Sequence, residues 1–155
     1  MYITTTNGFF SIKDRLGIQY QDLKRSKELK YRANYTSRQG FGLDGTIGDI
    51  FDSARYHSLL SNGYFKDDRD VALMGSVDGY QIFWQKTDDC WVVLIINANI
   101  CSEERVKKEN LLITAIIPGP KEPKDFNSFM YPIIKNLKEL EGNILLYCLI
   151  ISIWY

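Results

Sequence analysis

The pattern of hydrophobic and polar positions predicts strands in the middle of the chain. From Val71 to Trp84, β-forming residues occupy both parities, which is typical of a central strand covered on both faces. The runs WVVLII (91–96) and LLITAII (111–117) predict a second and a third strand. The segment 97–110 between them is polar and short, and we expect it to be an exposed connection.

A helical periodicity follows the third strand. Apolar residues recur there every three or four positions, which predicts a long amphipathic helix that covers the strands. These residues are Phe126, Phe129, Met130, Ile133, Ile134, Leu137 and Leu140. The run PGPKEPKD (118–125) predicts a rigid loop before the helix, which Asp125 or Ser128 can cap. Pro132 would kink a helix that starts at 126, or lie in the first turn of one that starts at 128.

The most hydrophobic segment, 144–155, is too short to cross a bilayer, which takes about 20 helical residues. It predicts a final apolar strand-like segment, either a buried strand or an ill-formed tail. The fold class is therefore α/β, with a three-stranded sheet, a long helix and this last segment.

The N-terminal part has a different character. Four glycines between Gln39 and Gly48 predict a flexible connection, so we divide the chain into a helical, basic arm with this connection (1–47) and the α/β unit (48–155). A short helix is expected at 53–61, with Asp52 as its N-cap.

Charge and composition narrow the function. The chain has 155 residues and no net charge, so an attraction to nucleic acid must come from a local patch. Basic residues gather in QDLKRSKELKYR, either as a solvated helix face or as phosphate contacts. The candidates for DNA contact are Lys24, Arg25, Lys27, Lys30 and Arg32.

Cysteine and histidine usage excludes several chemistries. The three cysteines share no C-x-x-C spacing, which favours reduced thiols in an intracellular protein. His57 is the single histidine, expected on a helix surface or half-buried, so a zinc site or a Ser-His-Asp triad is poorly supported. The N-terminus does not have the pattern of a signal peptide.

Asp78 is the one carboxylate within a strongly apolar strand pattern. Asp78-Gly79 favours a hairpin turn, because both residues tolerate the positive φ of a type I′ turn. The alternative is one long strand, 71–85, with Asp78 facing a metal site. The residues alone leave both alternatives open.

Four long stretches resemble the central part of CACTA-type (En/Spm-like) transposases, over roughly residues 28–142. The stretches are YRANYTSR, IGDIFDSARYHSLLSNGYFKDDRD, DVALMGSVDGYQIFWQKTDDCWVVLIINANI and EERVKKENLLITAIIPGPKEPKDFNSFMYPIIKNLKELEG. The resemblance implies an RNase H-like core that cuts and joins transposon ends with two Mg²⁺ or Mn²⁺ ions. It matches Asp78 to the first catalytic, metal-binding carboxylate and thereby favours the strand alternative. It also implies DNA as the partner and a nuclear location.

The sequence departs from this family after Gly142. The segment 144–155 contains no Asp or Glu, whereas the family continues into strands that carry the second acidic residue. We therefore expect a truncated transposase-derived protein without catalysis of its own, which does not hold the metals tightly. The alternatives are a module that binds DNA or a full-length transposase, and a decayed gene product. Neither a membrane nor a small-molecule substrate is expected.

Overall fold

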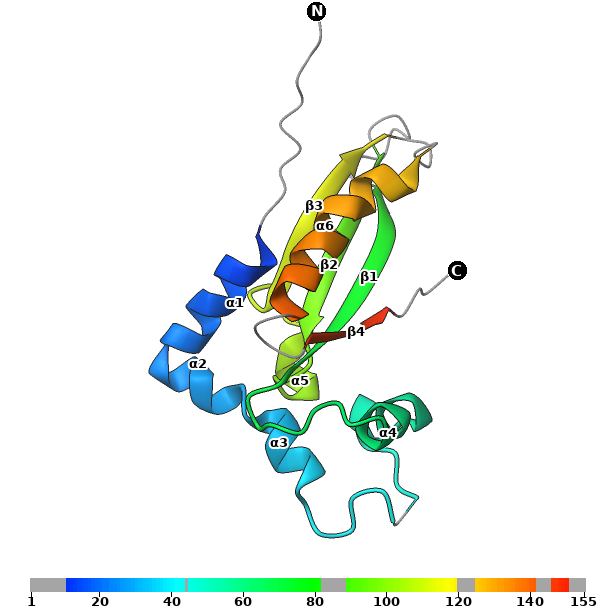
Figure 1. Ribbon diagram of the computed structural model, residues 1–155. Coiled ribbons are helices and arrows are strands. Elements are labelled where there is room, and N and C mark those ends of the chain that lie inside the picture. Colours follow the sequence, from blue (N-terminus) through cyan, green and yellow to red (C-terminus); the bar gives the residue numbers. More distant parts are fainter. Residues whose placement is uncertain (1–10, 44, 82–88, 120–124, 142–145, 151–155) are drawn as a thin grey trace, which may run out of the picture.

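The computed structural model describes residues 11–43, 45–81, 89–119, 125–141 and 146–150. Several helices precede the first strand, and two further helices lie between later strands (Figure 1). In chain order the elements are α1 (Ile12–Gln21), α2 (Leu23–Glu28), α3 (Tyr31–Thr36), the short 3-10 helix η1 (Ile50–Asp52), α4 (Ala54–Ser61), β1 (Val71–Gln81), β2 (Asp89–Asn97), α5 (Ser102–Arg105), β3 (Leu111–Pro118), α6 (Phe126–Glu141) and β4 (Leu146–Ile150).

The strands form one sheet in the order β3-β2-β1-β4. β1, β2 and β3 are antiparallel neighbours, whereas β4 lies parallel to β1 on its other side. A parallel neighbour requires a crossover connection, and α6 provides it between β3 and β4. The predicted α/β class and its three-stranded sheet are confirmed. The final strand-like segment is observed as β4, and residues 144–145 and 151–155 of that prediction lie outside the described residues.

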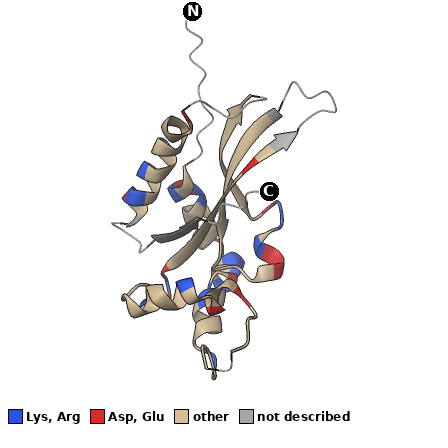
Figure 2. Ribbon diagram, turned by 90° about the vertical axis from the view of Figure 1, so that its right-hand side faces the viewer, with Lys and Arg blue, Asp and Glu red and all other residues tan. Residues whose placement is uncertain are grey.

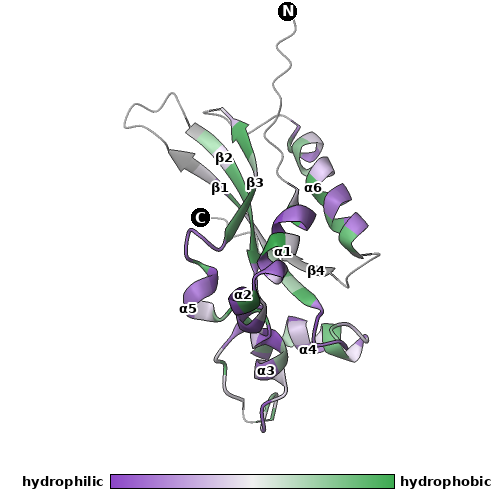
Figure 3. Ribbon diagram, turned by 90° about the vertical axis from the view of Figure 1, so that its left-hand side faces the viewer, coloured by the Kyte–Doolittle hydropathy of each residue, from purple (hydrophilic) through white to green (hydrophobic). Residues whose placement is uncertain are grey.

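One face of the sheet packs against α1 and α6, and we call this packing the sheet–helix core (Figure 1). Its buried side chains come from α1, α6 and the strands. They are Ile12, Leu16, Val71, Leu73, Val93, Ile95, Leu112, Ile117, Ile133 and Leu140. Each such burial contributes about 1.5–3 kcal/mol. Figure 3 shows the same division, with hydrophobic strands and helices whose outward sides are hydrophilic.

The opposite face of the sheet is covered only in part. An aromatic core made of Phe51, Tyr56 and Phe65 packs there against Ala72 and Met74 of β1. The ring centroids of Phe51 and Tyr56 are 4.9 Å apart, and those of Tyr56 and Phe65 are 5.1 Å apart. Residues on both sides of the predicted boundary at 47/48 contribute to this packing, because Tyr31 and Phe41 lie against the same core. The division into two parts stays a prediction.

Most predicted helices are confirmed. α6 begins at Phe126 and contains Pro132, and the carboxylate of Asp125 caps it by accepting a hydrogen bond from Ser128 N (3.2 Å). Ile134 departs from the predicted apolar stripe, because it is 41% exposed. α4 is capped by Ser53 instead of Asp52, because Asp52 belongs to η1.

The prediction of an exposed connection at 97–110 is wrong in part, because residues 97–100, Arg105 and Asn110 are buried, whereas residues 106–109 are exposed. Asn97, Asn99, Arg105 and Asn110 are all at most 4% exposed. Asn99 is an example of a buried side chain whose polar atoms are hydrogen-bonded. Its Oδ1 accepts a hydrogen bond from Ala72 N (2.9 Å) and its Nδ2 donates one to the carbonyl of Asp70 (2.9 Å). Buried polar groups are tolerated when they are paired in this way.

Among the described residues, no helix has the length and apolar character needed to cross a membrane.

Candidate functional site

Asp78 lies within β1, which confirms the strand alternative that the resemblance favours; the hairpin turn that local propensity favours at Asp78-Gly79 is not formed. β1 continues to Gln81 and pairs with β2 throughout, with Asp78 opposite Val92 and Gly79 opposite Trp91. Gly79 also lacks the positive φ that a type I′ turn would require. Two residues with low strand propensity are therefore held in a strand by their pairing with β2. Residues 82–85 of the predicted strand lie outside the described residues.

The carboxylate of Asp78 belongs to the face opposite α1 and α6. Alternate residues of a strand point to opposite faces, so Asp78 shares its face with Ala72 and Met74. Those two lie under the aromatic core, whereas Asp78 lies farther along the strand and is exposed. Across this face its neighbours are Val92 on β2 and then Ile116 on β3, which is 50% exposed. Asp78 therefore lies on an open part of the sheet, among apolar side chains and Ser76 of the same strand face.

The surroundings of Asp78 do not fit a two-metal site. Mg²⁺ and Mn²⁺ take several oxygen ligands, and two ions need carboxylates that converge on them. No group of three or more His, Cys, Asp or Glu side chains that could hold a metal ion occurs among the described residues. Figure 2 shows the same distribution: charged residues gather on the helices and loops, and the strands carry very few.

The basic residues predicted to contact DNA have different environments. Lys24, Lys27 and Lys30 are exposed on and after α2. Arg25 is half-buried and forms an ion pair with Glu28 (2.9 Å), which partly neutralises its charge. The three lysines remain as a basic surface, which we call the lysine patch.

Arg32 is a correction to this set, because it is 2% exposed and cannot reach a phosphate. Its guanidinium donates hydrogen bonds to the carbonyls of Asp70 (3.0 Å) and Asp67 (2.6 Å) and to the hydroxyl of Tyr56 (3.3 Å). Arg32 thus ties α3 to the loop before β1.

A second buried arginine has no counterpart in the predictions. Arg105 of α5 forms a bidentate ion pair with Asp49, whose Oδ1 lies 3.1 Å from Nη1. The hydroxyl of Tyr31 donates to the same carboxylate (2.8 Å). Burial and this bond to Asp49 raise the pKa of Tyr31 well above its usual value. The arrangement is structural, because every charged group is paired inside the protein.

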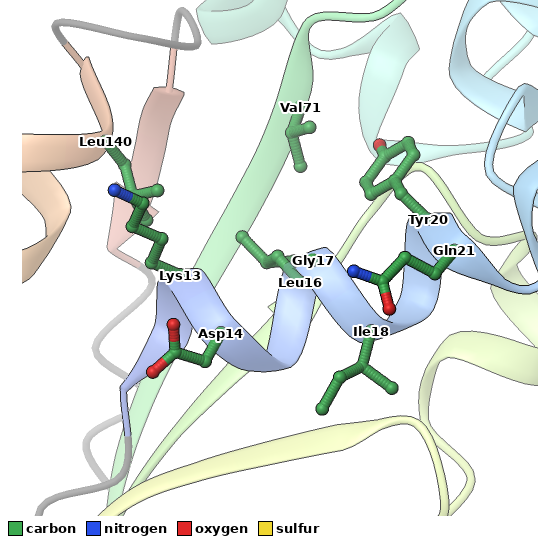
Figure 4. Close-up of a pocket in the computed structure, with 9 residues that line it drawn as sticks. All are labelled: Lys13, Asp14, Leu16, Gly17, Ile18, Tyr20, Gln21, Val71 and Leu140. Carbon is green, nitrogen blue, oxygen red and sulfur yellow. The ribbon is translucent and has the colours of Figure 1, made fainter.

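The cavity in Figure 4 lies elsewhere, between α1, the end of α6 and the start of β1. It has a volume of about 530 Å³, an apolar floor of Leu16, Val71 and Leu140, and polar side chains of Lys13 and Gln21 at its rim. Asp78 is not among the residues that line it. The cavity therefore brings no further group to Asp78.

Comparison with known families gives one match. The family model described as "Transposase family tnp2" matches residues 44–145. This range contains Asp78, β1 to β3 and α6, and it excludes α1, α2 and α3. No curated protein and no solved structure matches the chain.

Proposed function

The chain belongs to the transposase family tnp2, and on this premise we propose that it is a CACTA-type, transposase-derived domain that binds DNA and does not cleave it alone. Membership of the family supports a transposase-related function and, in general terms, an interaction with DNA. The CACTA type rests on the four sequence stretches given above. A nuclear location follows from DNA as the partner.

The order of the elements supports an RNase H-like core. The resemblance implies a first core strand that carries a catalytic Asp, then a strand-to-helix segment, and then strands that follow the long helix. Here Asp78 lies on β1, α6 follows β3, and β4 returns beside β1. Asp78 is therefore our candidate for the first catalytic carboxylate.

The isolation of Asp78 is the observation that carries the proposed lack of cleavage. Two-metal cleavage requires a second carboxylate close to the first. The residue paired with Asp78 on β2 is Val92. On the other side of β1, β4 pairs with Val71–Gly75, before Asp78, and its sequence LYCLI has no acidic residue. One exposed carboxylate does not hold two divalent ions.

Metal-dependent nicking of supercoiled plasmid tests this part of the proposal. We expect the purified chain in Mg²⁺ or Mn²⁺ to nick DNA no faster than its Asp78→Asn variant. Asp68→Asn is the matched control, because Asp68 is exposed and lies in the loop before β1, outside the strand that carries Asp78. Nicking that is lost in Asp78→Asn and kept in Asp68→Asn would overturn the proposed inactivity.

The lysine patch is our candidate for the DNA contact. A protein that neutralises phosphates releases counterions, and the slope of log K against log salt falls by about 0.9 for each contact. Replacing Lys24, Lys27 and Lys30 with glutamine should therefore reduce the magnitude of the slope by about 2–3. The matched control replaces three other exposed lysines, Lys108, Lys135 and Lys138.

Binding to a duplex oligonucleotide, measured by fluorescence anisotropy at several salt concentrations, gives both slopes. We expect the lysine-patch variant to lose affinity and the control variant to keep it. Equal loss in the two variants, or no binding by the unaltered chain, would refute the lysine patch as the contact.

A further inference from the structure

A cavity separate from that in Figure 4 lies where α2, α3 and α5 meet, and Figure 3 shows these three helices beside one another. Its volume of about 420 Å³ is within the range of small-ligand sites, roughly 300–1,000 Å³. Two segments, 27–34 and 100–104, supply all the residues that line it. The cavity is therefore formed by the helical arm and the connection between β2 and β3.

Lys27 supplies the positive charge of this cavity. The two carboxylates that line it are each paired with a cation, Glu28 with Arg25 (2.9 Å) and Glu104 with Lys107. Lys27 is exposed, and no ion pair of its ammonium group is found within the described ranges. The cavity therefore favours a ligand that places a negative charge at Lys27.

The other walls suit a planar, uncharged ring. Ile100 is 1% exposed and supplies an apolar surface, and Tyr31 supplies an aromatic one. Tyr31 is held in place, because its hydroxyl donates a hydrogen bond to Asp49 (2.8 Å) and its ring centroid lies 5.5 Å from that of Tyr35. A wall that is already fixed loses little freedom when a ligand binds. The exposed amide of Asn34 offers both a donor and an acceptor, which the polar edge of a nucleobase can use.

We propose that this cavity takes up one unpaired nucleotide of the DNA bound at the lysine patch, with its phosphate at Lys27 and its base against Tyr31 and Ile100. Lys27 belongs both to the lysine patch and to the cavity wall, so a phosphate bound there brings its own base to the cavity. A base inside a duplex is stacked and paired and cannot enter a pocket, whereas an unpaired base can. The inference rests on the proposed DNA contact and adds to it a preference for unpaired bases.

Fluorescence anisotropy on the whole chain compares three probes. They are a blunt duplex, the same duplex with short single-stranded overhangs, and a duplex whose overhangs have the same phosphates but abasic sugars. We expect the probe with bases to bind at least about fivefold more tightly than the abasic probe, which is the lower end of what stacking of one base on an aromatic side chain contributes. The abasic probe separates the effect of the base from that of the added charge.

Asn34→Ala should lower this affinity ratio about two- to tenfold, because the base loses a hydrogen bond to the amide. Gln39→Ala is the matched control, since Gln39 is also an exposed amide and does not line the cavity. It should leave the ratio unchanged.

Alkylation of Cys101 gives an independent readout, because its half-exposed thiol lines the cavity. Peptide mass spectrometry should show that the probe with bases slows the alkylation of Cys101 and that the abasic probe does not. A free deoxynucleoside monophosphate serves as the comparison, since it has the same phosphate and base without the rest of the DNA.

The outcomes separate this inference from the proposed function. Equal affinity for the probes with bases and with abasic overhangs would overturn the inference and leave the DNA contact at the lysine patch intact. No binding of any of the three probes would refute both. Protection of Cys101 by the free nucleotide, without protection by the overhang, would assign the cavity to a free nucleotide and overturn DNA as its source.

Discussion

Asp49 and Arg105 lie 56 residues apart in the sequence, and their side chains form a buried bidentate ion pair. The carboxylate is 0% exposed and the guanidinium is 4% exposed. The pair joins η1, which precedes the strands, to α5, which connects β2 and β3. It therefore fixes the aromatic core against the sheet.

Replacing Arg105 with methionine should lower the free energy of unfolding by about 3–5 kcal/mol, because it leaves the carboxylate of Asp49 buried and unpaired. Urea denaturation followed by circular dichroism measures the change. Lys107→Met is the matched control: Lys107 pairs with Glu104 on the surface, where such pairs contribute about 0–1 kcal/mol. Similar losses in the two variants would contradict the assigned role of Arg105.

Sequence patterns predicted the elements whose burial is regular. β2, β3 and α6 came from apolar runs and helical spacing, because an element that buries one face or two must repeat its apolar residues at the period of its backbone. The helical arm predicted within 1–47 is observed as α1, α2 and α3, but periodicity did not locate α1, where Ile12 and Leu16 are the only buried residues. Two apolar positions in a charged segment do not make a recognisable stripe.

The remaining errors concern groups whose partners are distant in the sequence. Arg32 is predicted on a basic surface and Arg105 lies in a connection predicted to be exposed, because charged residues are usually solvated. Their burial depends on carbonyls and a carboxylate supplied by other elements. Likewise, the local propensity of Asp78-Gly79 favours a turn, and these residues form a strand because they pair with Val92 and Trp91 of β2. Local propensity does not contain this information.

Arg32→Gln should lower the free energy of unfolding by about 2–3 kcal/mol, because the buried carbonyl of Asp70 and the part-buried carbonyl of Asp67 lose a charged donor. Lys30→Gln, two positions earlier and exposed, should change it by less than about 0.5 kcal/mol. The same denaturation curves test both variants. If Lys30→Gln lowered the free energy of unfolding and Arg32→Gln did not, the structural role assigned to Arg32 would be wrong.

Acid sensitivity should depend on Asp52, whose pKa lies below its usual value. Burial alone raises this pKa, but hydrogen bonds from the hydroxyl of Tyr35 and from the N–H groups of Gly48 (2.8 Å) and Asp49 (3.1 Å), with the charge of Arg38, outweigh it. A lowered folded-state pKa stabilises the protein above the unfolded value of about 3.9, and this stabilisation is lost as pH falls through the folded value.

Asp52→Asn should therefore be less stable than the unaltered chain at neutral pH, and the difference should narrow below about pH 4. Urea denaturation at a series of pH values measures it. A difference that stays constant with pH would show that the ionised carboxylate is not what stabilises the loop.

Leu16→Ala should cost about 2–5 kcal/mol, because Leu16 of α1 is 2% exposed in the sheet–helix core. Ile18→Ala on the same helix should cost little, since Ile18 is 66% exposed.

The family match starts at residue 44, after α1. A chain that begins at Asp22, and so lacks α1 and keeps α2 and α3, should expose the apolar face that α1 covers and bind more of a hydrophobic dye than the whole chain. Equal dye binding would contradict the assigned role of α1.

Gly79→Ala distinguishes a strand from a turn by the sign of its effect. In β1, a Cβ at Gly79 would meet no atom within 4 Å, and its φ is not positive. Alanine should therefore stabilise the chain by about 0.5–1 kcal/mol, because a strand glycine loses more backbone entropy on folding. Gly63 is the matched control: its φ is +85°, so Gly63→Ala should destabilise the chain. If Gly79→Ala destabilised the chain as Gly63→Ala does, Asp78-Gly79 would be a turn after all, and Asp78 would lose the strand position on which its proposed role depends.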